Sequence, residues 1–398
     1  MDNLRRIEEI QSALKEASVD GWLFYNFHGI DPFSSKILLF NEKALSTRRW
    51  FYFLPASGEP IRIVHRIEKE MLNGLPGEKW LYHSWKELHE HLGKALKDRE
   101  KIAMQYSPMN AIPYVSVVDG GTVDLIRSFG VEIVSSADLI QQFESVLTAE
   151  QLESHIYAVN TLRKIVDETF SRISESQRSG GTITEFSIQQ FMLELMKERS
   201  LVASHGLPIV AVNTHAADPH FEVEEQGSTE IREGDLVLLD LWGKKDEPSA
   251  VFGDITWMGY CGSEVPDRYE KVFQVIREAR DRAVGLIRTA LKEKRALRGW
   301  EVDREARGFI EKAGYGQYFI HRTGHSIGEM VHGPGVNIDS LETKDERCLI
   351  DNICFSIEPG IYLEGDFGVR TEIDVFIRDS EAAIYGEPIQ QRIVPILM

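Results

Sequence analysis

The segment DLVLLDLW, residues 235–242, decides how the second half of the chain folds. Its apolar run predicts a buried β-strand, and Asp240 stands inside that strand on the face it shares with Leu238 and Trp242. A carboxylate in such a place is costly unless it is paired or bound to a metal ion. The segment therefore predicts a charged partner or a cation next to Asp240.

A second aspartate, Asp254, opens the next strand-like run in FGDITW (252–257), after the turn-rich stretch GKKDEPSA (243–250). This pattern is typical of a β-hairpin. In a hairpin, Asp240 and Asp254 are expected to face one another with Cβ atoms about 4.5–5.5 Å apart. Two carboxylates at that spacing favour a bound cation. The alternative is that one of them lies in a loop and the other caps a turn.

Two more carboxylates stand in apolar, strand-like runs near the end of the chain. FSIEPGIYL (355–363) carries Glu358, and VRTEIDVFI (369–377) carries Glu372 with Arg370 and Asp374 on its face. The second half of the chain thus contains at least four buried-looking carboxylates that need a partner.

The histidines of HRTGHSIG (321–328) add an imidazole to this set. His321 and His325 are four residues apart, but Arg322 and a glycine stand between them, so the HExxH zinc motif is excluded. One imidazole with several carboxylates suits Mn²⁺, Fe²⁺, Co²⁺ or Zn²⁺, and four carboxylates are more than one such ion requires. Two ions about 3.5–4 Å apart can share a bridging water, lower its pKa and polarise a carbonyl oxygen as the water attacks.

The rhythm of the chain changes near residue 147. Residues 1–147 alternate short apolar runs with helix-compatible stretches, which indicates an α/β domain. Residues 148–398 mix helices with antiparallel strands, and a Thr148/Gln151 capping box begins their first long helix. Three further helices are predicted: one after a Thr182/Glu185 capping box, one over 269–294 and one over 302–313.

Composition limits the classes of function. The chain has 398 residues, 42% of them hydrophobic, which is enough for two domains, and its formal charge of −18 without a basic run argues against a nucleic-acid partner. The odd count of three cysteines, Cys261, Cys348 and Cys354, fits a reducing compartment. No segment has the apolar length of a signal peptide or a membrane span, so we expect a cytoplasmic protein without a membrane partner.

The order Asp240, Asp254, His325, Glu358, Glu372 resembles the metal ligands of the pita-bread metallopeptidases of family M24, which include methionine aminopeptidase, aminopeptidase P and prolidase. The resemblance implies an α/β (α+β) chain: a creatinase-like amino-terminal domain over 1–147, then a pita-bread catalytic domain over 148–398 with a curved antiparallel sheet covered by helices. Because bare methionine aminopeptidases lack the first domain, it favours the prolidase and aminopeptidase P branch. It also implies a homodimer and two divalent metal ions, with Mn²⁺ expected first and Co²⁺, Zn²⁺ or Fe²⁺ as alternatives.

The resemblance also implies a role for each of these five residues. Asp240 is expected to be a bidentate ligand of one metal ion, and Asp254 and Glu372 are expected to bridge both. His325 and Glu358 are expected to hold the second ion. A metal-bridging hydroxide is the expected nucleophile, and Glu358 relays its proton to the leaving nitrogen.

Three more residues take roles at the substrate by the same resemblance. His332 is expected to steady the tetrahedral intermediate, His220 to line the pocket for proline, and Arg370 to meet a substrate carboxylate. The remaining histidines are given no chemical role: His321 is expected to be a supporting neighbour, and His205 and His215 loop residues.

The resemblance therefore predicts hydrolysis of Xaa-Pro dipeptides, the reaction of a prolidase. An aminopeptidase P acting on longer Xaa-Pro peptides is the first alternative. A metal-free creatinase-like or non-catalytic binding protein is the second, although such proteins lose several of the five ligands. A dinuclear phosphoesterase fits neither the resemblance nor the few basic residues near the site.

Three departures from the family pattern leave substrate preference open. The interval from Asp240 to Asp254 is a few residues longer than is common, so its KKDEPSA loop either overhangs the pocket or makes a longer hairpin tip. Trp257 stands where prolidases usually have arginine, and Arg322 stands where the HGTGH form has glycine.

Overall fold

The computed structural model describes residues 3–40, 46–204 and 206–397. The chain divides into two compact units, Met1–Glu144 and Ser145–Met398. Each unit has hydrophobic clusters of its own. Among the described residues, no helix is both long enough and apolar enough to cross a membrane.

The first unit is built on one six-stranded sheet in the order β4-β3-β2-β1-β5-β6. Strand β2 pairs antiparallel with β1 and β3, and the other pairs are parallel. The runs GWLFYN and WFYFLP form the central strands and are buried throughout, as near-continuous apolar strands covered on both faces should be. The strands are β1 Gly21–Asn26, β2 Trp50–Pro55, β3 Ile61–His65, β4 Glu78–Tyr82, β5 Lys101–Met104 and β6 Glu132–Ser135.

Helices cover both faces of this sheet. Helix α1 (Asn3–Glu16) packs on one face through Ile7, Ile10 and Leu14, together with the short helices α2 (Ser34–Ile37) and α5 (Ala137–Ile140). Helices α3 (Trp85–Ala95) and α4 (Gly120–Arg127) pack on the other face. The result is the three-layer α/β arrangement that the alternating rhythm predicted.

The second unit contains the strands that carry the candidate site. One sheet has the order β17-β10-β9-β7 with β8 also paired to β9, a second has the order β11-β12-β15-β16, and β13 pairs with β14. All pairs are antiparallel except that of β10 with β17. The strands are β7 Leu201–Val202, β8 Ile209–Val212, β9 Leu236–Lys245, β10 Gly253–Tyr260, β11 Ser326–Ile327, β12 Cys354–Ile357, β13 Gly360–Leu363, β14 Phe367–Arg370, β15 Ile373–Arg378, β16 Glu381–Ile384 and β17 Val394–Pro395.

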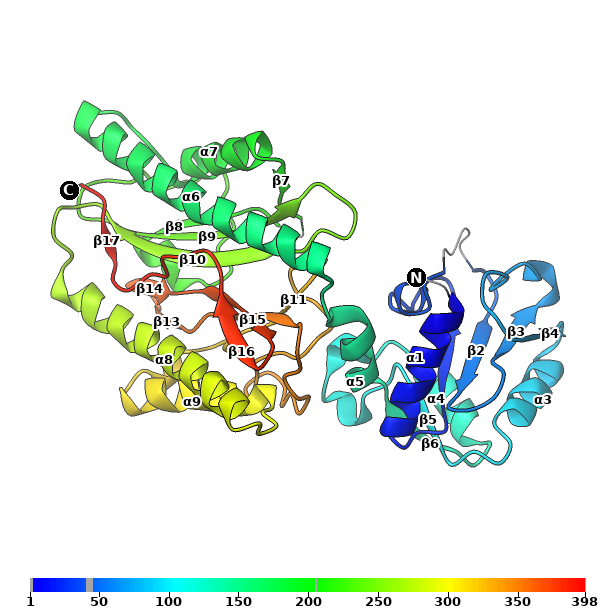
Figure 1. The fold of residues 1–398 in the computed structure, drawn as a ribbon. Coiled ribbons are helices and arrows are strands. Elements are labelled where there is room, and N and C mark those ends of the chain that lie inside the picture. Colours follow the sequence, from blue (N-terminus) through cyan, green and yellow to red (C-terminus); the bar gives the residue numbers. More distant parts are fainter. Residues whose placement is uncertain (1–2, 41–45, 205, 398) are drawn as a thin grey trace. The chain divides into compact units, whose positions relative to one another are not determined.

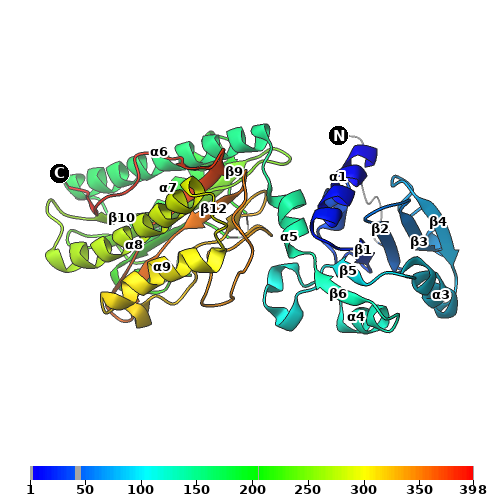
Figure 2. The same cartoon turned by 60° about the horizontal axis from the view of Figure 1, so that its bottom comes forward.

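Two pairs of helices enclose these strands. Figure 1 shows α6 (Ala149–Ser179) and α7 (Glu185–Glu198) on one side of the strands, and α8 (Asp267–Lys292) and α9 (Gly299–Lys312) on the other. In the turned view of Figure 2, α6 and α9 again lie on opposite sides. Each pair has its own apolar cluster with the strands it covers. The carboxylates of the middle strands therefore lie between two layers of helices.

The helix starts test the sequence predictions directly. The Thr148/Gln151 capping box is present at the start of α6, so that prediction is confirmed. The Thr182/Glu185 box was wrong, because α7 is capped by Thr184, whose hydroxyl accepts from the backbone of Ser187. Glu185 instead turns inward and accepts backbone N–H groups from Val212 and Thr229.

Candidate metal centre

A hairpin of β9 and β10 carries the first two predicted ligands. Its register pairs Asp240 with Thr256 and Asp254 with Trp242, so the expected direct pairing of the two aspartates was wrong. They are diagonal neighbours on one face, which is still within reach of a shared group. The side chain directly opposite Asp240 is the hydroxyl of Thr256.

The other three predicted ligands come from segments that meet this hairpin. His325 immediately precedes β11, and Glu358 immediately follows β12. The backbone N–H of Glu358 donates to Thr323 O at 2.7 Å, and that of Ser356 donates to His325 O at 2.9 Å, so the segments of His325 and Glu358 run side by side.

The expectation of one continuous strand through VRTEIDVFI was wrong. The chain makes two strands, β14 and β15, with Thr371 and Glu372 between them. The backbone N–H of Glu372 leaves the ladder and donates to Thr256 O at 3.4 Å. This break brings Glu372 beside the β9–β10 hairpin.

The structure brings all five predicted ligands together. Asp254, His325 and Glu372 each offer one ligand atom, and these atoms all lie within 4.8 Å of one another. His325 Nε2 lies 3.6 Å from Asp254 Oδ2 and 3.3 Å from Glu358 Oε1. Asp240 joins the group through Thr256, whose Oγ1 lies 3.2 Å from Asp240 Oδ1 and 2.7 Å from Glu372 Oε2.

Burial makes this cluster electrostatically expensive. It raises the pKa of Asp254 and Glu372 well above their ordinary values, raises that of Asp240, and raises that of Glu358 to about 7. Neighbouring carboxylates in the cluster add to the rise for Asp254, Glu358 and Glu372. Arg370 is a buried counter-charge, but one guanidinium does not balance four carboxylates. Divalent cations held by these oxygens and one imidazole fit both the charge and the donor chemistry.

The imidazole of His325 is oriented as a metal ligand requires. Its Nδ1 faces Ser326 O at 3.3 Å, which leaves the lone pair of Nε2 directed at Asp254 and Glu358. Burial lowers its pKa well below the ordinary value, and the neighbouring His332 and Arg322 lower it further. A neutral ring is the form that binds metal ions.

Arg370 does not lie as the sequence suggested. It is buried, and its Nη2 pairs with Asp240 Oδ2. Its Nε donates to Thr256 Oγ1 at 3.0 Å, and its Nη1 donates to Pro219 O and to Tyr362 Oη at 3.2 Å each. Four N–H donors of this side chain are therefore engaged within the protein, and its geometry suits orienting Asp240 better than gripping a substrate.

His321 lies at the end of the same network. Its Nδ1 donates to Arg322 O at 2.7 Å, so its Nε2 accepts from Tyr362 Oη at 2.8 Å. Burial lowers its pKa to about 3. A neutral, doubly hydrogen-bonded ring agrees with the supporting role expected for His321.

Two of the remaining predicted residues border the cluster from more exposed positions. The ring of His332 lies 4.3 Å from that of His325 at an interplanar angle of 77°, and its side chain is exposed. His220 is also exposed, and a positive charge on it acts on Asp240. Both rings are placed where a bound molecule can meet them.

Of the two histidines expected in loops, the structure describes only His215. His215 stacks on Phe221 and donates through Nδ1 to Glu185 Oε1 at 2.8 Å, so it anchors the segment that leads to His220. His205 lies outside the residues that the structure describes.

The sequence predicted no role for three side chains that support the cluster: Thr256, Tyr362 and Asp374. Asp374 is fully buried and accepts the backbone N–H of Asp254 at 2.9 Å, while its Oδ1 has no hydrogen-bond partner among the described residues. Strand alternation gave a signal for Thr256, two residues after Asp254, and for Asp374, two after Glu372. Tyr362 carried no such signal, because the turn at Pro359 hides its direction.

Two departures from the family pattern lie away from the cluster. Trp257 points to the face of β10 opposite Asp254, and the Arg163 guanidinium lies 3.7 Å from its ring centroid. The KKDEPSA interval is a longer hairpin tip: Val251 and Phe252 beyond it are fully buried, and Lys244 Nζ donates to Glu329 O at 2.7 Å. Arg322 alone of the three departures lies next to the site.

Comparisons with known proteins agree with this geometry. The family model described as metallopeptidase family M24 matches residues 157–379, more than half of the chain. An Xaa-Pro dipeptidase from Lactobacillus delbrueckii subsp. lactis is 28% identical over 289 residues, which cover 72% of this chain and 71% of that protein.

Solved structures resemble the chain over nearly its whole length. Dipeptidase PepE from Mycobacterium ulcerans gives a TM-score of 0.71 at 22% identity and covers 99% of this chain and 98% of that one. The recombinant prolidase from Thermococcus sibiricus gives 0.63 at 25% identity and covers 99% of each chain. These likenesses confirm the predicted α/β fold with a pita-bread second unit. The chain that brings these carboxylates and one histidine together therefore belongs to metallopeptidase family M24.

Proposed function

We propose that the protein is an Xaa-Pro dipeptidase whose catalytic centre holds two divalent metal ions. The observation that carries this proposal is the convergence of four buried carboxylates and one neutral imidazole. Relatives of the chain named Xaa-Pro dipeptidase, among them one from Pyrococcus furiosus that is 29% identical over 245 residues, support the choice of substrate.

The ligands in this proposal are those predicted from the sequence. Asp240 would hold one ion, His325 and Glu358 would hold the other, and Asp254 and Glu372 would contribute to both. When bound, the two ions supply a water of lowered pKa and polarise the scissile carbonyl. Manganese is the metal to test first, with cobalt, zinc and iron as competitors for an oxygen-rich site.

Glu358 is the proposed proton carrier. A carboxylate within hydrogen-bond reach of the attacking water can take up its proton, and Ser356 Oγ donates to Glu358 Oε1 at 3.1 Å and holds it in place. The proton taken from water passes to the leaving nitrogen of proline. His332 donates to the tetrahedral intermediate from its place beside His325, and His220 lines the proline side.

Arg370 takes a positioning role in this scheme. Its bonds to Asp240 and Thr256 hold the carboxylate of Asp240 in place. The same guanidinium also donates to Tyr362 Oη, which in turn donates to His321 Nε2. These hydrogen bonds connect Arg370, Tyr362 and His321 along one side of the site.

The two compact units suggest a division of labour. We assign the first to the creatinase-like amino-terminal domain and the second to catalysis, and we expect a homodimer. The odd count of three cysteines supports a reducing, cytoplasmic compartment. Sedimentation equilibrium tests the dimer: a monomer at micromolar concentration would contradict it.

The experiment that tests the function is a substrate panel with Mn²⁺-loaded protein. Xaa-Pro dipeptides, Xaa-Pro-Xaa tripeptides and Met-peptides are compared by kcat/KM, and we expect dipeptides to be cleaved best. Tripeptide hydrolysis of comparable efficiency indicates an aminopeptidase P instead. No hydrolysis, with less than one bound metal equivalent, indicates a metal-free binding protein.

A further inference from the structure

A buried ion pair on α9 lies outside the cluster of proposed metal ligands. Asp303 is fully buried, and Arg307, one helical turn later, is 9% exposed. Arg307 Nε and Nη2 donate to Asp303 Oδ2 and Oδ1 at 3.0 and 2.9 Å. A buried ion pair by itself stabilises a fold little, because apolar side chains of similar volume often do as well. The contribution of this pair therefore depends on the other hydrogen bonds that its two side chains make.

Arg307 holds the start of the segment that leads to His325. Its Nη1 donates to Phe319 O at 2.9 Å, and its Nη2 donates to His321 O at 2.8 Å. The centre of its guanidinium also lies 4.2 Å from the centroid of the Phe319 ring. Because both acceptors are backbone carbonyls, the arginine fixes the path of the chain and not only the orientation of a side chain.

Asp303 holds the next part of the same segment. Its Oδ1 accepts from the backbone N–H and the hydroxyl of Thr323 at 2.9 and 2.7 Å. Its Oδ2 accepts from the backbone N–H of Ser340 at 3.2 Å and from the hydroxyl of that serine. Since each oxygen also accepts from Arg307, the protein itself satisfies this buried carboxylate.

Thr323 connects the ion pair to the proposed metal ligands. Its carbonyl accepts the backbone N–H of Glu358 at 2.7 Å. His325, two residues after Thr323, donates its backbone N–H to Ser356 Oγ at 2.9 Å, and the same hydroxyl donates to Glu358 Oε1 at 3.1 Å. A displacement of Thr323 therefore acts on His325 and Glu358 together.

We propose that Asp303 and Arg307 are positioning residues that set the affinity of the metal centre for the ion assigned to His325 and Glu358. The inference rests on the two-ion centre of the proposed function. Removing a hydrogen-bonding partner that orients a metal ligand costs about 10–100-fold in metal affinity. Asp240, on β9, takes its hydrogen bonds from other side chains, so the affinity for the second ion should change little.

Mn²⁺ binding to the metal-stripped full chain tests this inference without a peptide substrate. Isothermal titration calorimetry gives the two dissociation constants of wild type, Asp303→Asn and Arg307→Lys. For Asp303→Asn, which keeps the shape and removes the charge, we expect one constant to rise about tenfold or more and the other to stay near its wild-type value. Arg307→Lys keeps the charge without the two-pronged geometry and should give a smaller rise at the same site.

A variant of one ligand identifies which ion is affected. His325→Ala removes the imidazole from the ion in question and leaves the ion assigned to Asp240. If Asp303 acts through His325 and Glu358, adding Asp303→Asn to this background should not weaken the remaining Mn²⁺ further. A general loosening of the fold would weaken that remaining ion as well.

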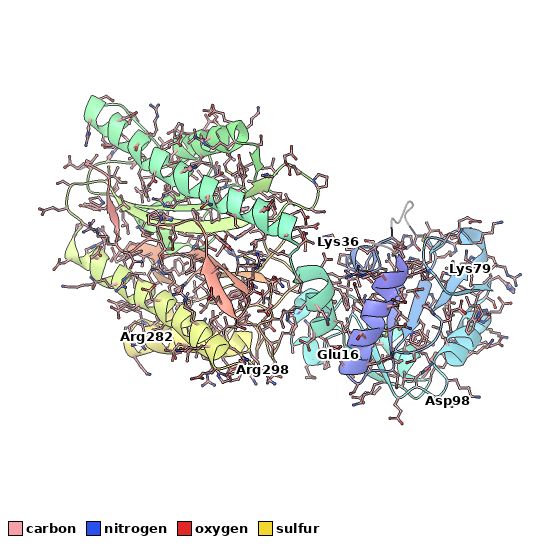
Figure 3. The ribbon with its side chains drawn as sticks, viewed as in Figure 1. Glu16, Lys36, Lys79, Asp98, Arg282 and Arg298 are labelled. Atoms are coloured by element: carbon pink, nitrogen blue, oxygen red, sulfur yellow. The ribbon has the colours of Figure 1, made fainter. Side chains whose placement is uncertain are left out.

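Two carboxylate-to-amide variants are the matched controls. Glu305→Gln lies on the same helix and removes a surface ion pair with Arg282 of α8, at 3.5 Å; Arg282 is labelled in Figure 3. Glu185→Gln removes a fully buried carboxylate that accepts backbone N–H groups, as Asp303 does. Neither variant should change the Mn²⁺ constants, although Glu185→Gln should lower the unfolding temperature.

The outcomes separate the inference from the centre on which it rests. Thermal unfolding shows which variants are folded, and Arg307→Lys carries the test if Asp303→Asn is not. Unchanged constants in a folded variant, an equal rise of both constants, the same rise in Glu185→Gln or further loss in the His325→Ala background overturns the role of the pair. Wild type that binds fewer than two Mn²⁺ ions contradicts the proposed centre itself, and the inference with it. Wild type that binds two ions and cleaves no Xaa-Pro peptide contradicts the proposed substrate alone.

Discussion

In the proposed function, Glu358 has two roles that usually belong to different residues, since it would be a metal ligand and a proton carrier at once. Replacing it with glutamine keeps a carbonyl oxygen and removes the exchangeable proton. For Glu358→Gln we expect kcat on Xaa-Pro to fall about 10²–10⁴-fold, the range for loss of a general acid and base. Steady-state kinetics with metal analysis checks this, and a kcat within tenfold of wild type would assign the proton to another group.

Thr256 is a single hydroxyl that serves three charged neighbours. It accepts from Arg370 and lies within hydrogen-bond distance of Asp240 and Glu372. Thr256→Val should cost about 1–3 kcal/mol of unfolding free energy, because it leaves buried polar groups unsatisfied, and should weaken metal binding.

The control for that variant is Thr289→Val on α8. Thr289 is exposed, and its hydroxyl donates only to Gly285 O one turn earlier. Denaturant unfolding of both variants makes the comparison. Equal losses at the two positions would mean that Thr256 plays no special part in the cluster.

At the level of single residues, the sequence predicted which side chains meet but not how Arg370 is used. A carboxylate inside an apolar strand is visible in the sequence because its cost is local. The partner of an arginine is not, because Arg370 reaches Asp240 across 130 positions of the chain. The backbone break at Glu372 is hidden in an uninterrupted strand-like alternation of charged and apolar residues.

At the level of elements, one glycine decides whether the histidine segment can approach the sheet. A Cβ at Gly324 would lie 1.9 Å from Ser356 O, in the strip where His325 and Glu358 run side by side. Gly324→Ala should therefore shift this segment, lower activity at least tenfold and reduce stability by about 1–3 kcal/mol.

Gly285→Ala on α8 is the matched control, and it should change stability in the opposite direction. Nothing lies within 4 Å of a Cβ built there, so alanine should stabilise the helix by about 0.5–1 kcal/mol without changing turnover. Thermal unfolding and kcat/KM test the pair. Similar effects at both positions would remove the special meaning of Gly324.

Elements were predictable where their signals are local. The Thr148/Gln151 box marked the start of α6 correctly because both partners lie within one helical turn. The start of α7 was misplaced by two residues because Thr182 and Thr184 carry equivalent hydroxyls, and Glu185 is drawn into the interior. The hairpin of β9 and β10 was expected, but its register depends on the long tip between the strands, which sequence does not fix.

For the whole molecule, metal binding and stability should be linked through pH. Burial raises the pKa of Glu358 from 4.5 to about 7 and those of Asp254 and Glu372 well above their usual values. The metal-free protein gains stability from these protonated groups below the unfolded pKa, and this gain is lost as pH rises through the folded values. Bound cations would replace these protons and offset the cost of burying ionised carboxylates at higher pH.

We therefore expect Mn²⁺ to raise the Tm more at pH 8 than at pH 5.5. His155 and His321, whose pKa values burial lowers to about 4 and about 3, stabilise the fold above their unfolded pKa, and that contribution is lost as pH falls. Neither is a proposed ligand, so their effect cancels between the metal-free and metal-loaded forms. Calorimetry with and without chelator tests the prediction, and an equal increment at both pH values contradicts it.

The fold class was predictable from the whole chain because two rhythms with different periods follow one another. The alternating runs of the first unit and the helix-and-strand pattern of the second reflect two separate cores. The arrangement of side chains around the cluster depends instead on contacts that are distant in sequence, such as that of Arg370 with Asp240.

The central claim is that five side chains remote in sequence hold two divalent ions. Metal analysis after Mn²⁺ loading and removal of free metal tests it most directly, on wild type, Asp254→Ala and Glu372→Ala. The account predicts two equivalents in wild type and less than one in either variant, with activity lost in parallel. Unchanged metal content and turnover in both variants would contradict it.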